Sequence, residues 1–150
     1  MNLDALMDAL KEDEGFRPLV YDDATGDPII AGSTLVGHPT IGYGWNLATD
    51  PITENQAADI LRRRTIQAYQ DASALIRNFV LLSDVRQNVL ANMAYNLGYH
   101  RLGTFKRLIA AVERKDYLSA AAEMENSRWY QQTGKRAVRL TKEMMTGQVG

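Results

Sequence analysis

Apolar residues recur at helical spacing near the start of the chain, at Leu3, Leu6, Met7 and Leu10. This spacing places them on one face of a helix. The glycine at position 15 is a residue type that commonly ends such a helix. The pattern therefore predicts an amphipathic helix over residues 2–13.

The pattern changes between Arg17 and Trp45, where helix-breaking residues separate short β-prone runs. The helix-breaking residues are Pro18, Gly26, Pro28, Gly32, Gly37, Pro39 and Gly42. The β-prone runs between them are residues 19–21, 29–30 and 40–41. Short runs bounded by glycine and proline are typical of strands joined by turns, so this segment is predicted to form a small antiparallel sheet or a set of hairpins.

After Pro51 the helical pattern returns and continues to the end of the chain. Thr53 and Gln56 have the spacing of a capping box, and the helix that they begin is expected to extend to about residue 78. Asp84 is predicted to cap the next helix, which would end at Gly98 and carry a buried stripe of Val85, Val89, Met93 and Leu97. Further helices are expected at about 104–114, 116–126 and 135–146, with Thr104 and Asp116 as caps.

Together these elements predict an α+β fold in a single domain of 150 residues. A lobe of about residues 1–50 would hold the first helix and the small sheet, and a mostly helical lobe would follow at about residues 51–150. A chain of this length can bury a sizeable core. Its 45% hydrophobic and 23% charged residues are ordinary for a globular protein.

Composition excludes several classes of function. The chain has no cysteine, which excludes disulfides and thiolate metal sites. Its net charge of −1 argues against nucleic-acid binding, which usually requires a large basic excess. Basic clusters such as residues 62–64 could face an anionic polymer or form solvated helix faces. We find no apolar stretch long enough to cross a membrane and no signal-peptide pattern, so we expect no membrane insertion and a location in the cytoplasm.

One acidic residue of the first helix falls on its apolar stripe. At about 100° per residue, Glu14 lies close to Leu3, Met7 and Leu10, whereas Glu12 points to the opposite face. Partial burial and the negative end of the helix dipole would both raise the pKa of a carboxyl group there. Glu14 is therefore a candidate general acid, or alternatively a carboxylate paired with an arginine at the edge of the core.

A second carboxylate follows in the β segment. Asp23 lies in a turn-like stretch before Gly26, where aspartate commonly bonds the nearby backbone. Glycoside hydrolysis requires one protonated and one ionised carboxyl group on opposite sides of the scissile bond. An acid in an apolar setting together with one on a polar loop would supply that difference.

These residues belong to a longer set of motifs that resembles the phage-type lysozyme (endolysin) family, glycoside hydrolase family 24. That family carries a glutamate, an aspartate nine residues later and a threonine that opens a T-I-G-x-G strand. The matching segments are residues 14–17, 21–26, 40–44, 92–98 and 127–137. The resemblance covers nearly the whole chain in the right order, and it implies a two-lobed lysozyme-like fold.

The resemblance implies a role for each matching residue. Glu14 would protonate the leaving glycosidic oxygen, Asp23 would orient or activate the attacking water, and Thr40 would hold that water, with inversion at the anomeric carbon. Arg136 matches an arginine that pairs with the catalytic glutamate, and Asn96 matches a polar residue that lines the sugar cleft. Tyr43, like Trp45, could stack on sugar rings or pack in the sheet. Trp129 and Tyr130 have the character of core anchors.

The sequence departs from the family pattern in three places. Sixteen residues separate Asp23 from Thr40, more than in the usual short hairpin, and the added segment at about residues 27–39 would extend the sheet lobe or edge the cleft. Trp45 stands where many members have histidine. The near-neutral charge predicts weaker attraction to the cell wall than in markedly basic members. His38 and His100 are too few and too far apart to suggest a metal site.

The expected reaction is hydrolysis of the β-1,4 bond between N-acetylmuramic acid and N-acetylglucosamine in peptidoglycan. Carboxylates and water suffice for it, so no cofactor is expected. The expected protein is a monomeric endolysin that stays in the host cytoplasm until a holin releases it to the periplasm and cell wall. The alternative is a non-catalytic peptidoglycan-binding or virion structural module on the same fold. A helical interaction protein with an accidental motif match is a more distant alternative.

Overall fold

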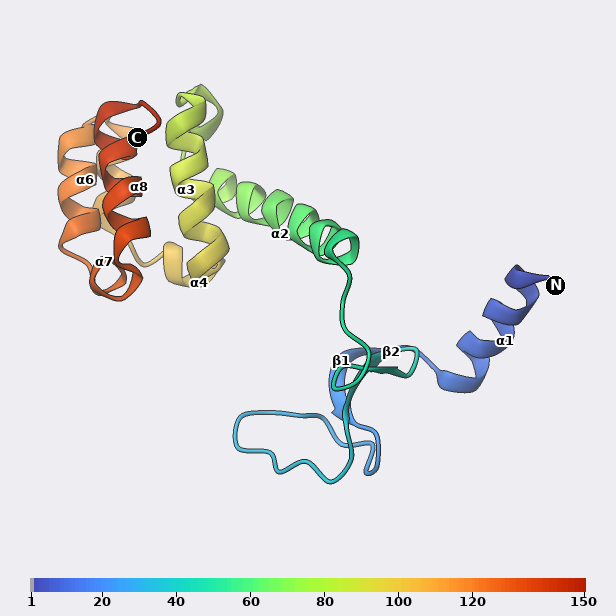
Figure 1. Ribbon diagram of the computed structural model, residues 1–150. Helices are drawn as coiled ribbons and strands as arrows, with labels where there is room; N and C mark the ends of the chain where they lie inside the picture. Colours follow the sequence, from blue (N-terminus) through green and yellow to red (C-terminus); the bar gives the residue numbers. More distant parts are fainter. Residues whose placement is uncertain (1) are drawn as a thin grey trace. The chain divides into compact units, whose positions relative to one another are not determined.

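The computed structural model describes residues 2–150. The chain divides into two compact units, the first ending at Ala57 and the second comprising Ala58–Gly150 (Figure 1). The boundary lies within the first turn of helix α2 (Glu54–Leu75), a few residues beyond the lobe boundary expected from the sequence. The first unit holds helix and sheet, and the second is helical, as the α+β prediction requires.

The first unit contains the predicted helix and the predicted small sheet. Helix α1 (Leu3–Glu14) begins at Asn2, whose side chain accepts a hydrogen bond of 3.2 Å from the backbone N–H of Ala5, and it ends at Gly15. Strands β1 (Arg17–Asp22), β2 (Pro39–Gly42) and β3 (Trp45–Asn46) form an antiparallel sheet in the order β1-β2-β3. The register places Tyr21 opposite Thr40 and Thr40 opposite Asn46.

The segment of about residues 27–39 connects β1 to β2 and carries no strand of its own. The β-prone run at residues 29–30 was expected to form a strand, and this prediction is wrong. A single bridge joins Tyr21 to Pro28, and the N–H of Ile29 donates to the carbonyl of Val20 at 3.1 Å. The proline at position 28 has no N–H to donate, which limits further pairing along this edge. The inserted loop therefore adds one short contact to the sheet and then leaves it.

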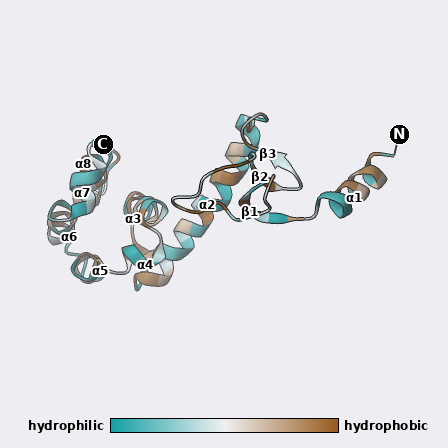
Figure 2. Cartoon of the chain, turned by 90° about the horizontal axis from the view of Figure 1, so that it is seen from below, coloured by the Kyte–Doolittle hydropathy of each residue, from teal (hydrophilic) through white to brown (hydrophobic). Residues whose placement is uncertain are grey.

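The apolar face of α1 is exposed. No residue of this helix is buried, and 45–55% of the surface of each apolar residue in the stripe remains accessible, for Leu3, Leu6, Met7 and Leu10. In Figure 2 the ribbon of α1 carries both hydrophobic (brown) and hydrophilic (teal) stretches. Glu14 is likewise exposed, so the partial burial predicted for it is not found. Among the described residues of the first unit, no element packs extensively on the apolar face of α1, which leaves these side chains accessible.

The second unit consists of helices around one core. Its elements after α2 are η1 (Phe79–Leu81), α3 (Asp84–Leu97), α4 (Tyr99–Leu102), α5 (Lys106–Glu113), α6 (Tyr117–Glu125), α7 (Arg128–Thr133) and α8 (Lys135–Thr146). Figure 1 shows α6 and α8 packed side by side. The largest buried side chains of the core include Phe79, Leu90, Met93, Met124, Leu140 and Met144.

Most of the predicted helix boundaries are confirmed to within a few residues. The capping box is present, since Gln56 N–H donates to Thr53 Oγ1 at 3.3 Å and Thr53 N–H donates to Gln56 Oε1 at 2.8 Å. Asp116 caps α6 as predicted, accepting from the N–H of Ser119 at 3.1 Å.

Three details at helix ends differ from prediction. Helix α2 ends at Leu75 rather than near residue 78, and Ser83 rather than Asp84 precedes α3. Thr104 does not cap α5, since its hydroxyl donates to the carbonyl of Arg101 at 2.6 Å instead. Helix α7 was not predicted, because six residues are too few to show helical periodicity.

The core anchors of the second unit are confirmed. Trp129 is buried in the core, and Tyr130 packs against it. Val89 and Met93 of the predicted stripe on α3 are fully buried, while the flanking Val85 and Leu97 are half-buried. Among the described residues, no helix combines the length and apolarity needed to cross a membrane.

Candidate active site

The carboxyl group of Glu14, at the last residue of α1, lies against the backbone of the glycine-rich turn between β2 and β3. A Cβ atom placed on Gly44 would stand 2.5 Å from Glu14 Oε2 and 3.0 Å from its Cδ. Gly44 also has φ +71°, a conformation that glycine adopts readily and other residues do not. The second glycine of the T-I-G-x-G motif therefore allows both the turn and the close approach of the acid.

Of the two adjacent aspartates, Asp22 is buried and holds the inserted loop. Its carboxylate accepts three backbone hydrogen bonds, from Val36 at 2.6 Å, from Gly37 at 2.9 Å and from Ala24 at 2.9 Å. A carboxylate is an acceptor with about four lone-pair sites, so it can satisfy all three donors. Asp22 thus fixes the return of the loop next to the start of β2.

These hydrogen bonds favour the ionised form of Asp22. The backbone N–H of Val36 lowers the pKa of this carboxyl group most, burial opposes it, and the N–H groups of Ala24, Gly37 and Thr25 lower it further. The net effect is a pKa below the ordinary value for aspartate. A pKa lowered by folding contributes stability above the unfolded-state value, and this contribution is lost as the pH falls through the folded-state value.

We therefore expect the effect of Asp22→Asn on stability to depend on pH. The unfolded-state pKa of aspartate is about 3.9, so the variant should be less stable than the wild type at pH 7. The difference should shrink as the pH falls below about 4, because the carboxylate is then protonated first in the unfolded state and, at still lower pH, in the folded state. Urea unfolding of both proteins across this range measures it.

The exposed Asp27→Asn in the same loop is the matched control, and it should leave the loop anchored. A constant difference between wild type and Asp22→Asn at all pH values would contradict the role given to the Asp22 carboxylate.

Asp23, the predicted catalytic aspartate, is exposed at the end of β1 and contacts His38. The backbone N–H of His38 donates to Asp23 Oδ1 at 2.7 Å, and His38 Nδ1 lies 3.4 Å from Asp23 Oδ2. The backbone N–H of Asp23 in turn donates to the carbonyl of His38 at 3.1 Å. Gly37 also lies against the carboxylate, since a Cβ there would collide with Asp23 Oδ1 and with Ala24.

Thr40, the predicted holder of the attacking water, is buried in β2. Its hydroxyl donates to the carbonyl of His38 at 3.2 Å. Because this bond uses the hydroxyl hydrogen, the lone pairs of Oγ1 remain as acceptors. One carbonyl, that of His38, therefore accepts hydrogen bonds from both Asp23 and Thr40.

The aromatic residues of the glycine-rich turn differ in exposure. Tyr43 is exposed and its ring lies 5.4 Å from that of Phe16, in a tilted arrangement. Trp45 is half-buried, and its indole N–H donates to the carbonyl of Asp50 at 2.9 Å. Tyr43 is therefore open to solvent for stacking, whereas Trp45 supports the turn after β3.

The two site residues predicted in the second unit are held by their own neighbours. Asn96 Oδ1, on α3, accepts the indole N–H of Trp129 at 2.9 Å. The guanidinium of Arg136, on α8, donates to Asn92, with Nε 2.7 Å from Oδ1. The predicted pairing of Arg136 with Glu14 and the predicted contact of Asn96 with sugar stay predictions.

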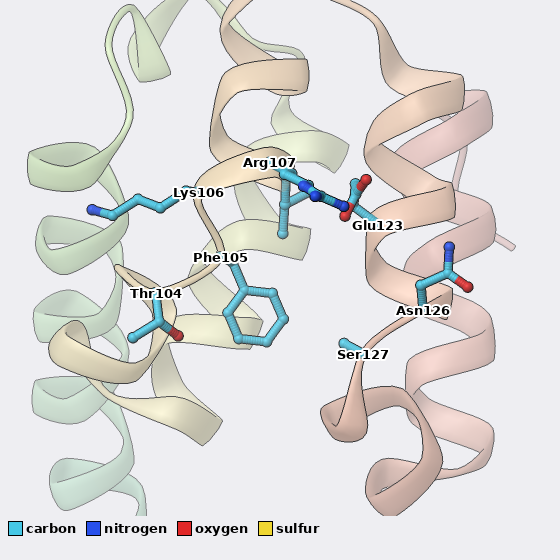
Figure 3. Close-up of a pocket in the computed structure, with 8 residues that line it drawn as sticks. Thr104, Phe105, Lys106, Arg107, Glu123, Asn126 and Ser127 are labelled. Atoms are coloured by element: carbon cyan, nitrogen blue, oxygen red, sulfur yellow. The ribbon is translucent and has the colours of Figure 1, made fainter.

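Of two pockets in the second unit, one is lined by a predicted site residue and the other is not. Arg136, Asn92 and Tyr95 line one of about 420 Å³. Another, of about 390 Å³, lies between the start of α5 and the end of α6, and no predicted site residue lines it (Figure 3). Figure 3 shows Arg107 extending toward Glu123 across this pocket while Lys106 points away. Among the described residues, no group of three or more histidine or carboxylate side chains could hold a metal ion.

In the first unit, the structure thus places Glu14 against one end of the β2–β3 turn and links Asp23 with Thr40 at the other end of β2. Sequence reasoning missed Asp22 and His38. The register of the β1–β2 pair could have identified His38. Asp22 pairs with Pro39 in this antiparallel pair, so Asp23, which follows Asp22, lies beside His38, which precedes Pro39.

Comparison with known proteins shows the family of the chain. The profile of the phage lysozyme family matches residues 11–143. The chain belongs to the phage lysozyme family and is a hydrolase of the lysozyme class.

Proteins similar in sequence to this chain come from phages and from Dictyostelium discoideum. Probable T4-type lysozyme 2 of Dictyostelium discoideum is 27% identical, with 95% of each chain covered. The pre-baseplate central spike protein Gp5 of Enterobacteria phage T4 is also 27% identical, over 95% of this chain and 28% of that protein. The peptidoglycan hydrolase gp36 of Pseudomonas phage phiKMV is 28% identical, over 90% of this chain and 14% of that protein.

Proposed function

We propose that this protein hydrolyses the β-1,4 bond between N-acetylmuramic acid and N-acetylglucosamine in bacterial peptidoglycan. The observation that carries the proposal is the placement of two carboxylates, Glu14 and Asp23, against the hairpin segment of residues 38–44, which also holds Thr40. Membership of the phage lysozyme family supports the reaction class. The name of the phiKMV relative, a peptidoglycan hydrolase, supports the substrate.

In the proposed mechanism Glu14 is the general acid. Its protonated carboxyl group donates a proton to the glycosidic oxygen as the bond from that oxygen to the anomeric carbon breaks. The exposure of Glu14 and its position at the turn make the group accessible to a polymer. The glycine at position 44 leaves room for the carboxyl group beside the backbone.

Water completes the reaction from the other face of the sugar. Asp23 accepts one proton from the water as the water oxygen bonds to the anomeric carbon. Thr40 accepts a hydrogen bond from the other hydrogen, which stays on the hydroxyl of the product. This outcome is an inversion. Inversion requires room for a water molecule between the two carboxylates, and Glu14 and Asp23 adjoin different residues of the hairpin, Gly44 and His38.

Nuclear magnetic resonance of the first product formed tests the inverting mechanism. The β-linked substrate should give the α-anomer first, and mutarotation should then equilibrate it. Asp23→Asn should slow turnover but leave more residual activity than a variant of Glu14, since water can still reach the anomeric carbon. The β-anomer as first product would indicate retention and would contradict the role given to Asp23.

We also propose that the protein acts in phage-induced host lysis as a monomer that a holin releases from the cytoplasm to the cell wall. Membership of a phage lysozyme family supports this role. The T4 relative is named a pre-baseplate central spike protein, and its similarity to this chain supports a structural role as the second candidate function. Binding to peptidoglycan without turnover would favour the second candidate function, a non-catalytic module of that kind.

A further inference from the structure

The inserted loop delivers one residue that contacts two of the proposed catalytic groups. His38 precedes β2, forms hydrogen bonds with Asp23 through its backbone N–H and carbonyl, and brings its imidazole Nδ1 to 3.4 Å from Asp23 Oδ2. Its carbonyl also accepts the hydroxyl hydrogen of Thr40. Asp22 holds the preceding residues of the loop through Val36 and Gly37, so the position of His38 is itself fixed.

We propose that His38 is a positioning residue that fixes the orientation of the Asp23 carboxylate through its imidazole. The proposal rests on the proposed function, in which Asp23 acts on water. The backbone of His38 sets the distance between Asp23 and Thr40, and the side chain prevents rotation of the carboxylate. The inserted loop thus contributes a side chain to the site in addition to lengthening the sheet unit.

The geometry explains why the imidazole would matter. The side chain of Asp23 is 37% exposed, so packing alone does not hold its carboxylate in one orientation. The backbone N–H of His38 donates to Oδ1, and its Nδ1 lies 3.4 Å from Oδ2. Both carboxylate oxygens of Asp23 therefore contact the same residue. A carboxylate has about four lone-pair sites, which leaves acceptors free for water after both contacts are made.

The contact should affect catalysis far more than stability. Both side chains are more than a third exposed, and ion pairs at such positions contribute little to folding. Asp23 is the acidic side chain that contacts the imidazole, while the carboxylate of neighbouring Asp22 is occupied by backbone N–H groups. The effect of removing the imidazole should therefore pass through Asp23 alone.

His38→Ala isolates the imidazole, because the three backbone hydrogen bonds of residue 38 remain. We expect kcat on soluble peptidoglycan strands to fall by about ten- to hundredfold, the range for a misoriented catalytic group. KM should stay within about twofold, since binding of the glycan is not changed. His100→Ala, which removes the other histidine of the chain, is the matched control and should match the wild type.

Rescue separates positioning from a general structural role. The side-chain amide of His38→Asn can place an N–H donor where Nδ1 lies, so this variant should recover most of the lost kcat. In the Asp23→Asn background, His38→Ala should have little further effect, because the two residues act as a unit.

Three results would overturn the proposal. They are a wild-type kcat in His38→Ala, no recovery in His38→Asn, and a full additional loss from His38→Ala in the Asp23→Asn background. In each case a wild type that turns over and a Glu14→Gln variant that does not would leave the proposed function intact. A wild type without turnover would overturn the proposed function and this proposal together.

Discussion

Glu14→Gln is expected to lower kcat by about 10²–10⁴-fold, the usual contribution of a general acid. Glutamine has nearly the size and shape of glutamate, and it can keep the contact with the backbone of Gly44. Its amide cannot transfer a proton to the leaving oxygen as a carboxylic acid does. The loss should therefore appear in kcat, with the fold and the affinity for glycan retained.

The matched control for this variant is Glu12→Gln. Glu12 lies on the same helix two residues earlier and is also exposed, but the helical spacing places it on another face. It should leave kcat unchanged, and circular dichroism should show both variants folded. Equal activity of folded Glu14→Gln and wild type would refute the role of Glu14.

Gly44→Ala is expected to reduce activity by about 100-fold, because a displacement near 1 Å of a catalytic group costs about this much. The new Cβ would stand 2.5 Å from Glu14 Oε2, so the carboxyl group must move away. A flexible side chain can do so at small cost to the fold. The positive φ of residue 44 adds a destabilisation of about 1–2 kcal/mol.

Gly42→Ala separates these two effects. Gly42 has nearly the same φ, +69° against +71°, but a Cβ there would meet no atom within 4 Å. Both variants should lose similar stability in urea unfolding, while Gly44→Ala should lose much more kcat. Equal losses of kcat would mean that backbone strain alone accounts for the effect and that Glu14 does not depend on Gly44.

Much of the fold follows from local patterns in the sequence. Helices with clear caps and long periodicity, such as α2 and α6, are predicted because Thr53 and Asp116 act through bonds to residues only three positions away. The strand at residues 29–30 was predicted wrongly because β-propensity depends on a pairing partner. Pro28 and the anchoring of the loop by Asp22 leave that run without one.

The sequence predicts the catalytic residues of the site better than it predicts the residues that hold them in position. Glu14, Asp23 and Thr40 follow from motif spacing, but which of two adjacent aspartates is buried depends on strand register. The structure buries Asp22 and exposes Asp23. His38 could have been found by extending the hairpin register one residue past Pro39. The burial expected for Glu14 failed because the amphipathic pattern of α1 shows only that one face is apolar, and it does not show what covers that face.

The most direct test of the account is the identity of the new chain ends that the purified protein releases from peptidoglycan. The digest is reduced with borohydride, and the reduced sugars are identified by mass spectrometry. The account predicts reduced N-acetylmuramic acid at the new ends, formed by the wild type and not by Glu14→Gln. Reduced N-acetylglucosamine, newly freed amino groups of the peptide stem, or no new ends from several peptidoglycans would contradict it.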